Sequence, residues 1–147
     1  MDAVVYCTVA TRTGVYADGT LRLMSHDGSP SIDGAGRLDM FRAGVWGSVC
    51  SEGFMPGSAA VACKQMGFNS GQQLAGTTRC IANGKYFCAN APHVAEVSCS
   101  GRELEITSCP FEQGEDVFCS ASEAVILDCV GDGETFGAPA KMSSHLA

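Results

Sequence analysis

The sequence predicts a disulfide-rich domain of the α+β class, built from short strands and one helix. Three observations lead to this prediction: a hairpin pattern over residues 36–50, a single good helix pattern ending at Gly67, and nine cysteines in 147 residues. Apolar residues come in short runs, so long helices are not expected. No run approaches the roughly 18 apolar residues that a membrane span needs.

The stretch Gly36–Cys50 contains the only tryptophan and has the pattern of two strands around a tight turn. Its first half alternates, which places Leu38 and Met40 on one face and residues 37, 39 and 41 on the other. Ala43-Gly44 is the predicted turn, because glycine accepts a positive φ at little cost. Cys50 ends the second strand and is expected to tie the hairpin to a distant part of the chain.

The helix is predicted from Ala59 to Met66. Pro56 suits a helix start, Ser58 is the expected N-cap, and Gly67 marks the end. Cys63 lies on the apolar face of this helix at helical spacing, so it is expected to staple the helix to the sheet.

Further strands are expected at residues 21–23, 94–99 and 124–127, the last of them buried. One helical turn within residues 101–108 is expected to carry Leu104 and Ile106, and residues 26–36, 68–91 and 110–118 read as loops. This divides the chain into an extension or the end of a preceding domain at residues 1–20, a domain at 21–130, and a flexible tail or linker at 131–147.

The cysteines indicate a disulfide framework. They are Cys7, Cys50, Cys63, Cys80, Cys88, Cys99, Cys109, Cys119 and Cys129. There is no Cys-x-x-Cys and the three histidines are scattered, which disfavours zinc, whereas disulfides indicate an oxidising, extracellular setting. Cys80 and Cys88 flank Asn83-Gly84, and a three-residue turn would place them opposite each other, so a local disulfide is expected there. If all others pair, one cysteine stays unpaired within the chain.

Several function classes are disfavoured. The formal charge of −7 argues against nucleic-acid and acidic-membrane binding. Gly-x-Ser-x-Gly is absent, no histidine lies near a cysteine or serine motif, and residues 131–137 miss the Gly-x-Gly-x-x-Gly spacing, so no enzyme is expected. No secretory signal is visible, and we expect the chain to be part of a larger secreted or surface protein.

Four separated blocks resemble the scavenger receptor cysteine-rich (SRCR) family. Residues 36–50 resemble its Gly-Arg-Val-Glu-Val…Trp-Gly-Thr-Val-Cys signature, and Leu21–Leu23 resembles its opening Leu-Arg-Leu. Residues 59–67 resemble Ala-Ala-Val-Val-Cys-Arg-Gln-Leu-Gly. Val97–Gly101, followed by Glu103 and Cys109-Pro110, matches Val-x-Cys-x-Gly…Glu…Cys-Pro. The resemblance extends from Leu21 to Cys129.

This resemblance implies a curved antiparallel sheet that cradles one α-helix. It also implies three disulfides: Cys50–Cys119, Cys63–Cys129 and Cys99–Cys109. Phe68 stands where some members have a further cysteine, so the sequence resembles the six-cysteine subtype, with Cys80 and Cys88 as an added loop pair. Cys7 lies outside the domain, and our hypothesis is that it pairs with a cysteine elsewhere in a larger protein.

The resemblance also implies an extracellular ligand-binding or adhesion module without catalysis. Several members bind Ca²⁺ through acids that follow the tryptophan block and precede the last cysteine. Here Ser51 replaces the first acid, Glu52 retains the second and Glu123 stands at the later position, while Glu96 remains from a second acidic site. These four residues are the candidate cation ligands, because Ca²⁺ needs several oxygen atoms. No cofactor is otherwise required.

The expected partner is a protein or polyanionic ligand, or other domains of the same larger protein. Polyanions bind some family members through arginine clusters. The arginines available for this role here are Arg22, Arg37, Arg42, Arg79 and Arg102, of which Arg37, inside the signature block, is the one with an expected structural role. The alternative function is a structural spacer in a multidomain adhesin, with no ligand site of its own.

Overall fold

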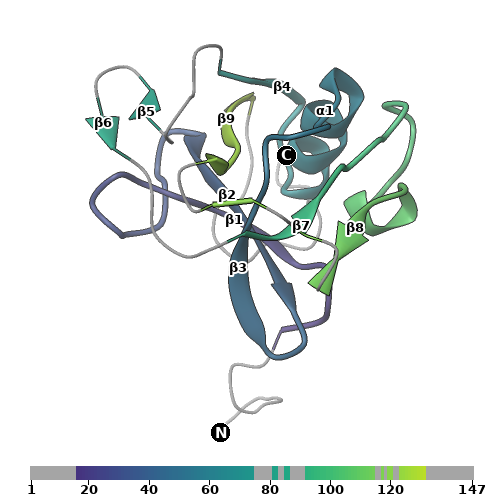
Figure 1. The fold of residues 1–147 in the computed structure, drawn as a ribbon. Coiled ribbons are helices and arrows are strands. Elements are labelled where there is room, and N and C mark those ends of the chain that lie inside the picture. The colour runs from purple at the N-terminus through teal and green to yellow at the C-terminus, as the bar shows by residue number, and fades with distance from the viewer. Residues whose placement is uncertain are drawn as a thin grey trace, which may run out of the picture.

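The computed structural model describes residues 16–74, 81–82, 85–86, 92–114, 117, 119–120 and 123–131 (Figure 1). The elements follow one another as β1 (Leu21–Met24), β2 (Ala35–Arg42), β3 (Val45–Val49), α1 (Pro56–Gln65), β4 (Ser70–Gln73), β5 (Ile81–Ala82), β6 (Lys85–Tyr86), β7 (Pro92–Ala95), a 3₁₀ turn (Ile106–Ser108), β8 (Glu112–Gln113) and β9 (Ile126–Val130). The described part contains no helix that is long and apolar enough to span a membrane.

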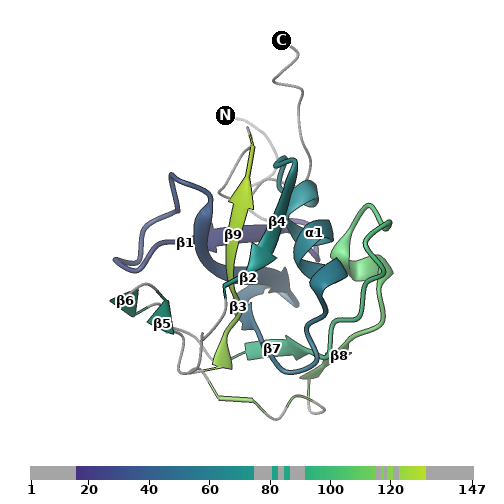
Figure 2. The ribbon, with the colours of Figure 1, turned by 90° about the horizontal axis from the view of Figure 1, so that it is seen from above.

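Seven strands form one sheet in the order β4-β9-β2-β3-β7-β8, with β1 also paired to β2. Every pairing in it is antiparallel except that of β3 with β7, which is parallel. Helix α1 packs against β4 and β9, and Figure 2 shows it alongside β4. The predicted α+β fold, one helix on a largely antiparallel sheet, is confirmed.

The core lies between the helix and the sheet. From β1 and β2 it takes Leu21, Leu23, Leu38 and Met40, all with 0% exposure. Four apolar side chains of α1 and that of the C-cap residue meet them, together with two residues of the β9 region: Ala59, Val61, Ala62, Cys63, Met66, Val125 and Leu127. The predicted alternation of β2 is therefore correct for its inner face, because Leu38 and Met40 both enter this core.

The β2–β3 hairpin turns at Ala43-Gly44, as predicted. Arg42 pairs with Val45, so the loop has two residues, and both adopt positive φ, 52° at Ala43 and 83° at Gly44. Positive φ at both positions matches the right-handed twist of the flanking strands. The sequence indicated this geometry for Gly44 alone, since alanine adopts it at some cost.

Helix α1 begins earlier than predicted, and the expected Ser58 cap is wrong. Met55 is the N-cap residue and makes no side-chain capping hydrogen bond, while Ser58 lies inside the helix with 0% exposure. The Ser58 hydroxyl donates to the Val97 carbonyl oxygen at 2.8 Å and accepts from the Cys99 N–H at 3.0 Å. It satisfies the backbone of the segment after β7 instead of the first turn of its own helix.

Several other elements differ from expectation. Strand β8 lies inside the stretch 110–118 that was read as loop, and β9 covers Ile126–Val130 instead of residues 124–127. Strand β4 lies in a stretch read as loop, because its Ser-Gly-Gln-Gln sequence has little β propensity and forms a strand only by pairing with β9. Strand β7 starts at Pro92 and ends at Ala95 instead of covering residues 94–99. In the loop that follows, Ile106 is buried but Leu104 is 87% exposed, so the two do not share a helical face.

The structure contains the disulfides Cys50–Cys119, Cys63–Cys129 and Cys99–Cys109, as the resemblance implied. Strands β5 and β6 form the expected small hairpin, but Ala82 pairs directly with Lys85. Two residues therefore separate the strands, and not the three that would place Cys80 directly opposite Cys88. The Cys80–Cys88 pairing and Cys7 lie outside the described residues.

Replacement of Ser58 tests its buried role. Ser58→Ala should leave the Cys99 N–H and the Val97 carbonyl without this partner, at a cost of about 1–3 kcal/mol in the free energy of unfolding. Urea denaturation followed by the fluorescence of Trp46 measures the loss. Ser70→Ala, on the exposed side of β4, is the matched control and should change stability by less than about 0.5 kcal/mol. A loss in Ser58→Ala no larger than in the control contradicts the assignment.

Candidate functional site

The end of β3 carries two of the predicted cation ligands, Ser51 and Glu52. The residue before them, Cys50, is buried and forms a β-bridge with Ala124. This bridge fixes the backbone from which Ser51 and Glu52 continue. The Ser51 N–H donates to the Glu123 carbonyl oxygen at 2.7 Å. The Val125 N–H donates to the Val49 carbonyl oxygen at 2.8 Å. Glu123 is therefore held beside Ser51 by main-chain hydrogen bonds.

Glu96 reaches the same place from β7. Its N–H donates to the Glu52 carbonyl oxygen at 3.1 Å. Glu96 has a φ of 57°, which ends the strand and is unusual for a residue with a side chain. Gly53 makes this approach possible, because a β-carbon there would lie 2.9 Å from the Glu96 Cα. The chain thus accepts a strained backbone where these two acidic segments meet.

We call Ser51, Glu52, Glu96 and Glu123 the acid corner. The structure brings these four predicted residues together from three separate segments of the chain. Glu52 and Glu123 are exposed, whereas Ser51 and Glu96 are half-buried. The carboxylates can therefore meet a ligand from solvent without unfolding of the domain.

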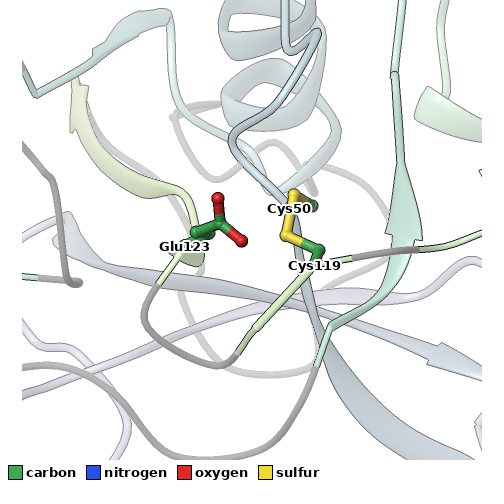
Figure 3. Close-up of side chains that lie close together, drawn as sticks. All are labelled: Cys50, Cys119 and Glu123. Atoms are coloured by element: carbon green, nitrogen blue, oxygen red, sulfur yellow. A yellow bond between two sulfur atoms is a disulfide. The ribbon is translucent and has the colours of Figure 1, made fainter.

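The Glu123 side chain lies next to the Cys50–Cys119 disulfide (Figure 3). Glu123 Oε1 accepts the Ser120 N–H at 2.9 Å. The carboxylate and the two sulfurs lie within 4.8 Å of one another. Disulfide sulfurs are not thiolates, and Ca²⁺ takes oxygen ligands, so this trio by itself is not a calcium site. In the described residues no trio at this spacing consists of carboxylates alone.

A second carboxylate, Glu103, lies beside the Cys99–Cys109 disulfide but has a different role. Its carboxylate oxygens accept the N–H groups of Ser100 and Gly101 at 3.1 Å. These hydrogen bonds, first of all that from Ser100, lower the pKa of Glu103 from 4.5 to about 2. The carboxylate closes the turn after Cys99, so the glutamate that matched the family motif is structural.

The arginine candidates do not form one exposed cluster. Arg37 is buried, and its guanidinium bonds both carboxylate oxygens of Asp39, at 2.8 and 2.9 Å. Arg22 bonds the same carboxylate at 3.0 Å and lies 4.2 Å from the centre of the Trp46 ring. Because Asp39 has 0% exposure, these two arginines stabilise a buried charge on the outer face of β2.

The remaining arginines are spread out. Arg42 donates to the Gln113 side chain and lies 5.3 Å from the centre of the Phe111 ring. Arg102 is exposed in the loop between Cys99 and Cys109. Arg79 lies outside the described residues. Arg22 and Arg37 thus share one carboxylate, while Arg42 and Arg102 make other contacts or none of this kind, so the described arginines do not form a single exposed basic cluster.

Two features of this region were not expected from the sequence. Glu112 of β8 pairs directly with Ala95, which places a further acid one residue from Glu96. A two-residue strand has no periodic pattern, so nothing marked it. Asp39 was expected to share a face with Arg37, but not to be buried. The signal that could have indicated its burial is the pair of opposite charges, Arg37 and Asp39, two residues apart on one face of the strand.

Comparisons with known proteins agree with this architecture. The family model described as scavenger receptor cysteine-rich domain matches residues 27–130. A scavenger receptor cysteine-rich domain superfamily protein of Patiria pectinifera is 32% identical over 113 residues, which are 76% of this chain and 9% of that protein. Human lysyl oxidase homolog 3 is 32% identical over 96 residues, which are 65% of this chain and 12% of that protein. The chain thus corresponds to a small part of these relatives.

Two solved structures share the fold. The SRCR domain of mouse MARCO, in its dimeric form, matches with a TM-score of 0.54 and 20% identity, over 65% of this chain and 85% of that one. The third SRCR domain of murine neurotrypsin matches with a TM-score of 0.52 and 23% identity, over 74% of this chain and 95% of that one. At these identities the likeness concerns the fold alone.

The lowered pKa of Glu103 predicts a pH-dependent stability. Because its pKa is about 2 in the folded protein and 4.5 ordinarily, the ionised carboxylate stabilises the fold above pH 4.5. This contribution should be lost as the pH falls from 4.5 to 2. We expect Glu103→Gln to be less stable than the wild type at pH 7, with a difference that disappears towards pH 2 in urea titrations.

Glu105→Gln is the matched control for this experiment, since the Glu105 carboxylate lies at 3.4 Å from the Thr107 hydroxyl and not on backbone N–H groups. It should not reproduce the pH dependence of the difference. A Glu103→Gln difference that stays constant from pH 7 to pH 2 contradicts the assigned role.

Proposed function

Since the chain belongs to the scavenger receptor cysteine-rich domain family, we propose that it is an extracellular recognition module of a longer protein, with the acid corner as its binding surface. Domains of this family are in general extracellular, non-catalytic modules that mediate protein interactions. The likeness to lysyl oxidase homolog 3 is confined to 12% of that protein, so no oxidase activity is proposed here.

One observation carries the proposal. The hydrogen bonds from Ser51 N–H to the Glu123 carbonyl and from Glu96 N–H to the Glu52 carbonyl bring three chain segments together at the surface. Strained backbone at Glu96 supports the same reading, since residues held in such conformations cluster at binding sites.

Ca²⁺ is the ion that suits this chemistry. The carboxylates of Glu52, Glu96 and Glu123 supply hard oxygen atoms, and Ser51 adds a hydroxyl. Their side chains must rotate to converge on one ion, and Glu123 must give up its hydrogen bond with Ser120. Such a site binds Ca²⁺ weakly, with a dissociation constant on the order of 10⁻⁴–10⁻³ M, as in other extracellular modules.

A protein ligand fits better than a polyanion that binds arginines. Asp39 neutralises part of the charge of Arg22 and Arg37 on the outer face of β2. A cation in the exposed acid corner would keep free coordination positions, which an acidic side chain of the partner can occupy. The ligand in this proposal is therefore a protein surface that presents a carboxylate.

Calorimetry with Ca²⁺ tests the acid corner directly. Titration of the wild-type protein with Ca²⁺ should give a measurable heat of binding, and the fitted dissociation constant should lie in the sub-millimolar to millimolar range. Glu123→Gln, which keeps the shape of the side chain, should weaken binding at least about tenfold, because Ca²⁺ loses one charged ligand. Asp27→Asn removes one charge from the exposed loop before β2 and should bind like the wild type.

Equal heats for wild type and Glu123→Gln would exclude the acid corner as the calcium site. Absence of binding to Ca²⁺, to an acidic protein surface such as carboxylated albumin and to dextran sulfate would favour the alternative function, a structural spacer in a multidomain adhesin.

A further inference from the structure

The Cys50–Cys119 disulfide differs from the other two in exposure. Of the six half-cystines that the structure describes, Cys119 alone is half-buried, and the other five have exposures between 0% and 6%. A thiolate cleaves a disulfide by attacking one sulfur along the line of the S–S bond, so the attacked sulfur must be reachable. Among the described half-cystines, Cys119 is the residue that solvent reaches furthest, which makes its sulfur the best candidate for attack.

The partner sulfur is arranged as a leaving group. Cys50 has 0% exposure, so an external thiol cannot reach it directly. The Glu52 N–H points at Cys50 Sγ, with the nitrogen 3.3 Å from the sulfur. When the S–S bond breaks, negative charge develops on the leaving sulfur, and this N–H is already in place to stabilise it.

Neither other disulfide offers this combination. In Cys99–Cys109 both residues are buried, and Cys109 Sγ lies 3.9 Å from the Glu105 carbonyl oxygen. A disulfide sulfur has no hydrogen to donate, so that oxygen opposes a negative charge there. The Glu123 carboxylate opposes one near Cys50 and Cys119 as well, and the difference between the two disulfides lies in the Glu52 N–H that points at Cys50 Sγ. Cys63–Cys129 is buried between α1 and β9, where Gly71 packs against Cys63.

We propose that Cys119 is a modification site, at which a low-molecular-weight thiol undergoes exchange with the Cys50–Cys119 disulfide. The attacking thiolate forms a bond to Cys119 Sγ, the S–S bond breaks, and Cys50 leaves as a thiolate. The products are a mixed disulfide on Cys119 and one free cysteine. Attack by a second thiolate on the small thiol's sulfur releases a small disulfide and leaves Cys119 as a thiolate, so two thiols are oxidised for each disulfide reduced.

Glu123 sets which thiols react fastest. Its carboxylate lies within 4.8 Å of both sulfurs, so it repels an approaching anion and attracts a cation. Two unit charges about 4 Å apart in water interact strongly enough to change a rate roughly fivefold. The preferred reagent is therefore an aminothiol, and its adduct on Cys119 places an ammonium group beside the acid corner.

Native exchange followed by mapping tests the site. The folded chain is treated with low-millimolar cysteamine, quenched with an alkylating reagent at several times, and digested for mass spectrometry. Cys119 should carry the mixed disulfide while Cys50 is alkylated, and both should react at least about tenfold faster than the other four described half-cystines. Adduct on Cys50 instead of Cys119, or equal rates at all three disulfides, overturns the proposal.

Charge selectivity is tested by comparing the rates at which cysteamine and 3-mercaptopropionate react at Cys119. Each rate is divided by the rate of the same thiol with a linear peptide disulfide, which corrects for the intrinsic reactivity of the thiol. At low salt the corrected rate at Cys119 should favour cysteamine by about fivefold or more. Glu123→Gln should lower this preference severalfold. Glu103→Gln is the matched control, because the Glu103 carboxylate also lies within 4.8 Å of a disulfide, the buried Cys99–Cys109 pair, and it should leave the preference unchanged. A preference that Glu123→Gln does not alter overturns the role of Glu123.

Discussion

The structure depends on the main-chain hydrogen bonds that gather three segments around the end of β3. The Cys50 N–H donates to Val94 of β7 at 2.8 Å, and the Ser51 N–H donates to Glu123 at 2.7 Å. On the other side, the Val125 N–H donates back to the carbonyl oxygen of residue 49 at 2.8 Å. One strand end thereby fixes the parallel neighbour β7, the segment before β9 and the acids that both carry. The Cys50–Cys119 disulfide adds a covalent link at the same point.

Buried polar side chains fix the rest of the architecture. Gln65 at the end of α1 donates to the Gly19 carbonyl oxygen at 3.0 Å and accepts the Ile106 N–H at 2.9 Å. Ser58 plays the same part at the other end of the helix, towards Val97 and Cys99. Each of these bonds satisfies backbone in an irregular segment that lacks sheet or helix partners. A domain with short strands and long connections needs such bonds, because its loops cannot satisfy their own backbone.

The sequence was a good guide where an element has a local signal. The alternation of Leu38 and Met40 and the glycine at position 44 predicted a strand and a turn at their observed places. The apolar run at residues 124–127 predicted the last strand two residues too early, because β9 covers Ile126–Val130. Such signals fail for β4 and β8, whose polar residues become strands only because β9 and β7 offer partners. The N-cap prediction for Ser58 was wrong for a related reason. A serine near a helix start suits a cap, but the hydrogen bonds of Ser58 go to Val97 and Cys99, which are distant in the sequence.

In the acid corner, too, the sequence indicates the residues, whereas tertiary contacts determine how they are arranged. The resemblance to a family pointed to Ser51, Glu52 and Glu123 as one site and to Glu96 as the remnant of a second. That all four lie close together depends on hydrogen bonds between distant segments. Neither the left-handed backbone of Glu96 nor its contact with Gly53 has a local sequence signal. Asp39 also was placed on the correct face of β2, yet its burial between Arg22 and Arg37 follows from what covers that face.

The central claim is that the fold itself holds the acid corner together before any cation binds. Native-state hydrogen exchange of the Ser51 amide, in chelator and without Ca²⁺, tests it most directly. The reference is the Leu38 amide, which lies in β2 and donates to the Val125 carbonyl oxygen at 2.9 Å. The account predicts that both amides exchange through global unfolding, with opening free energies within about 1 kcal/mol of each other. An opening free energy for Ser51 several kcal/mol lower, restored by added Ca²⁺, would contradict it.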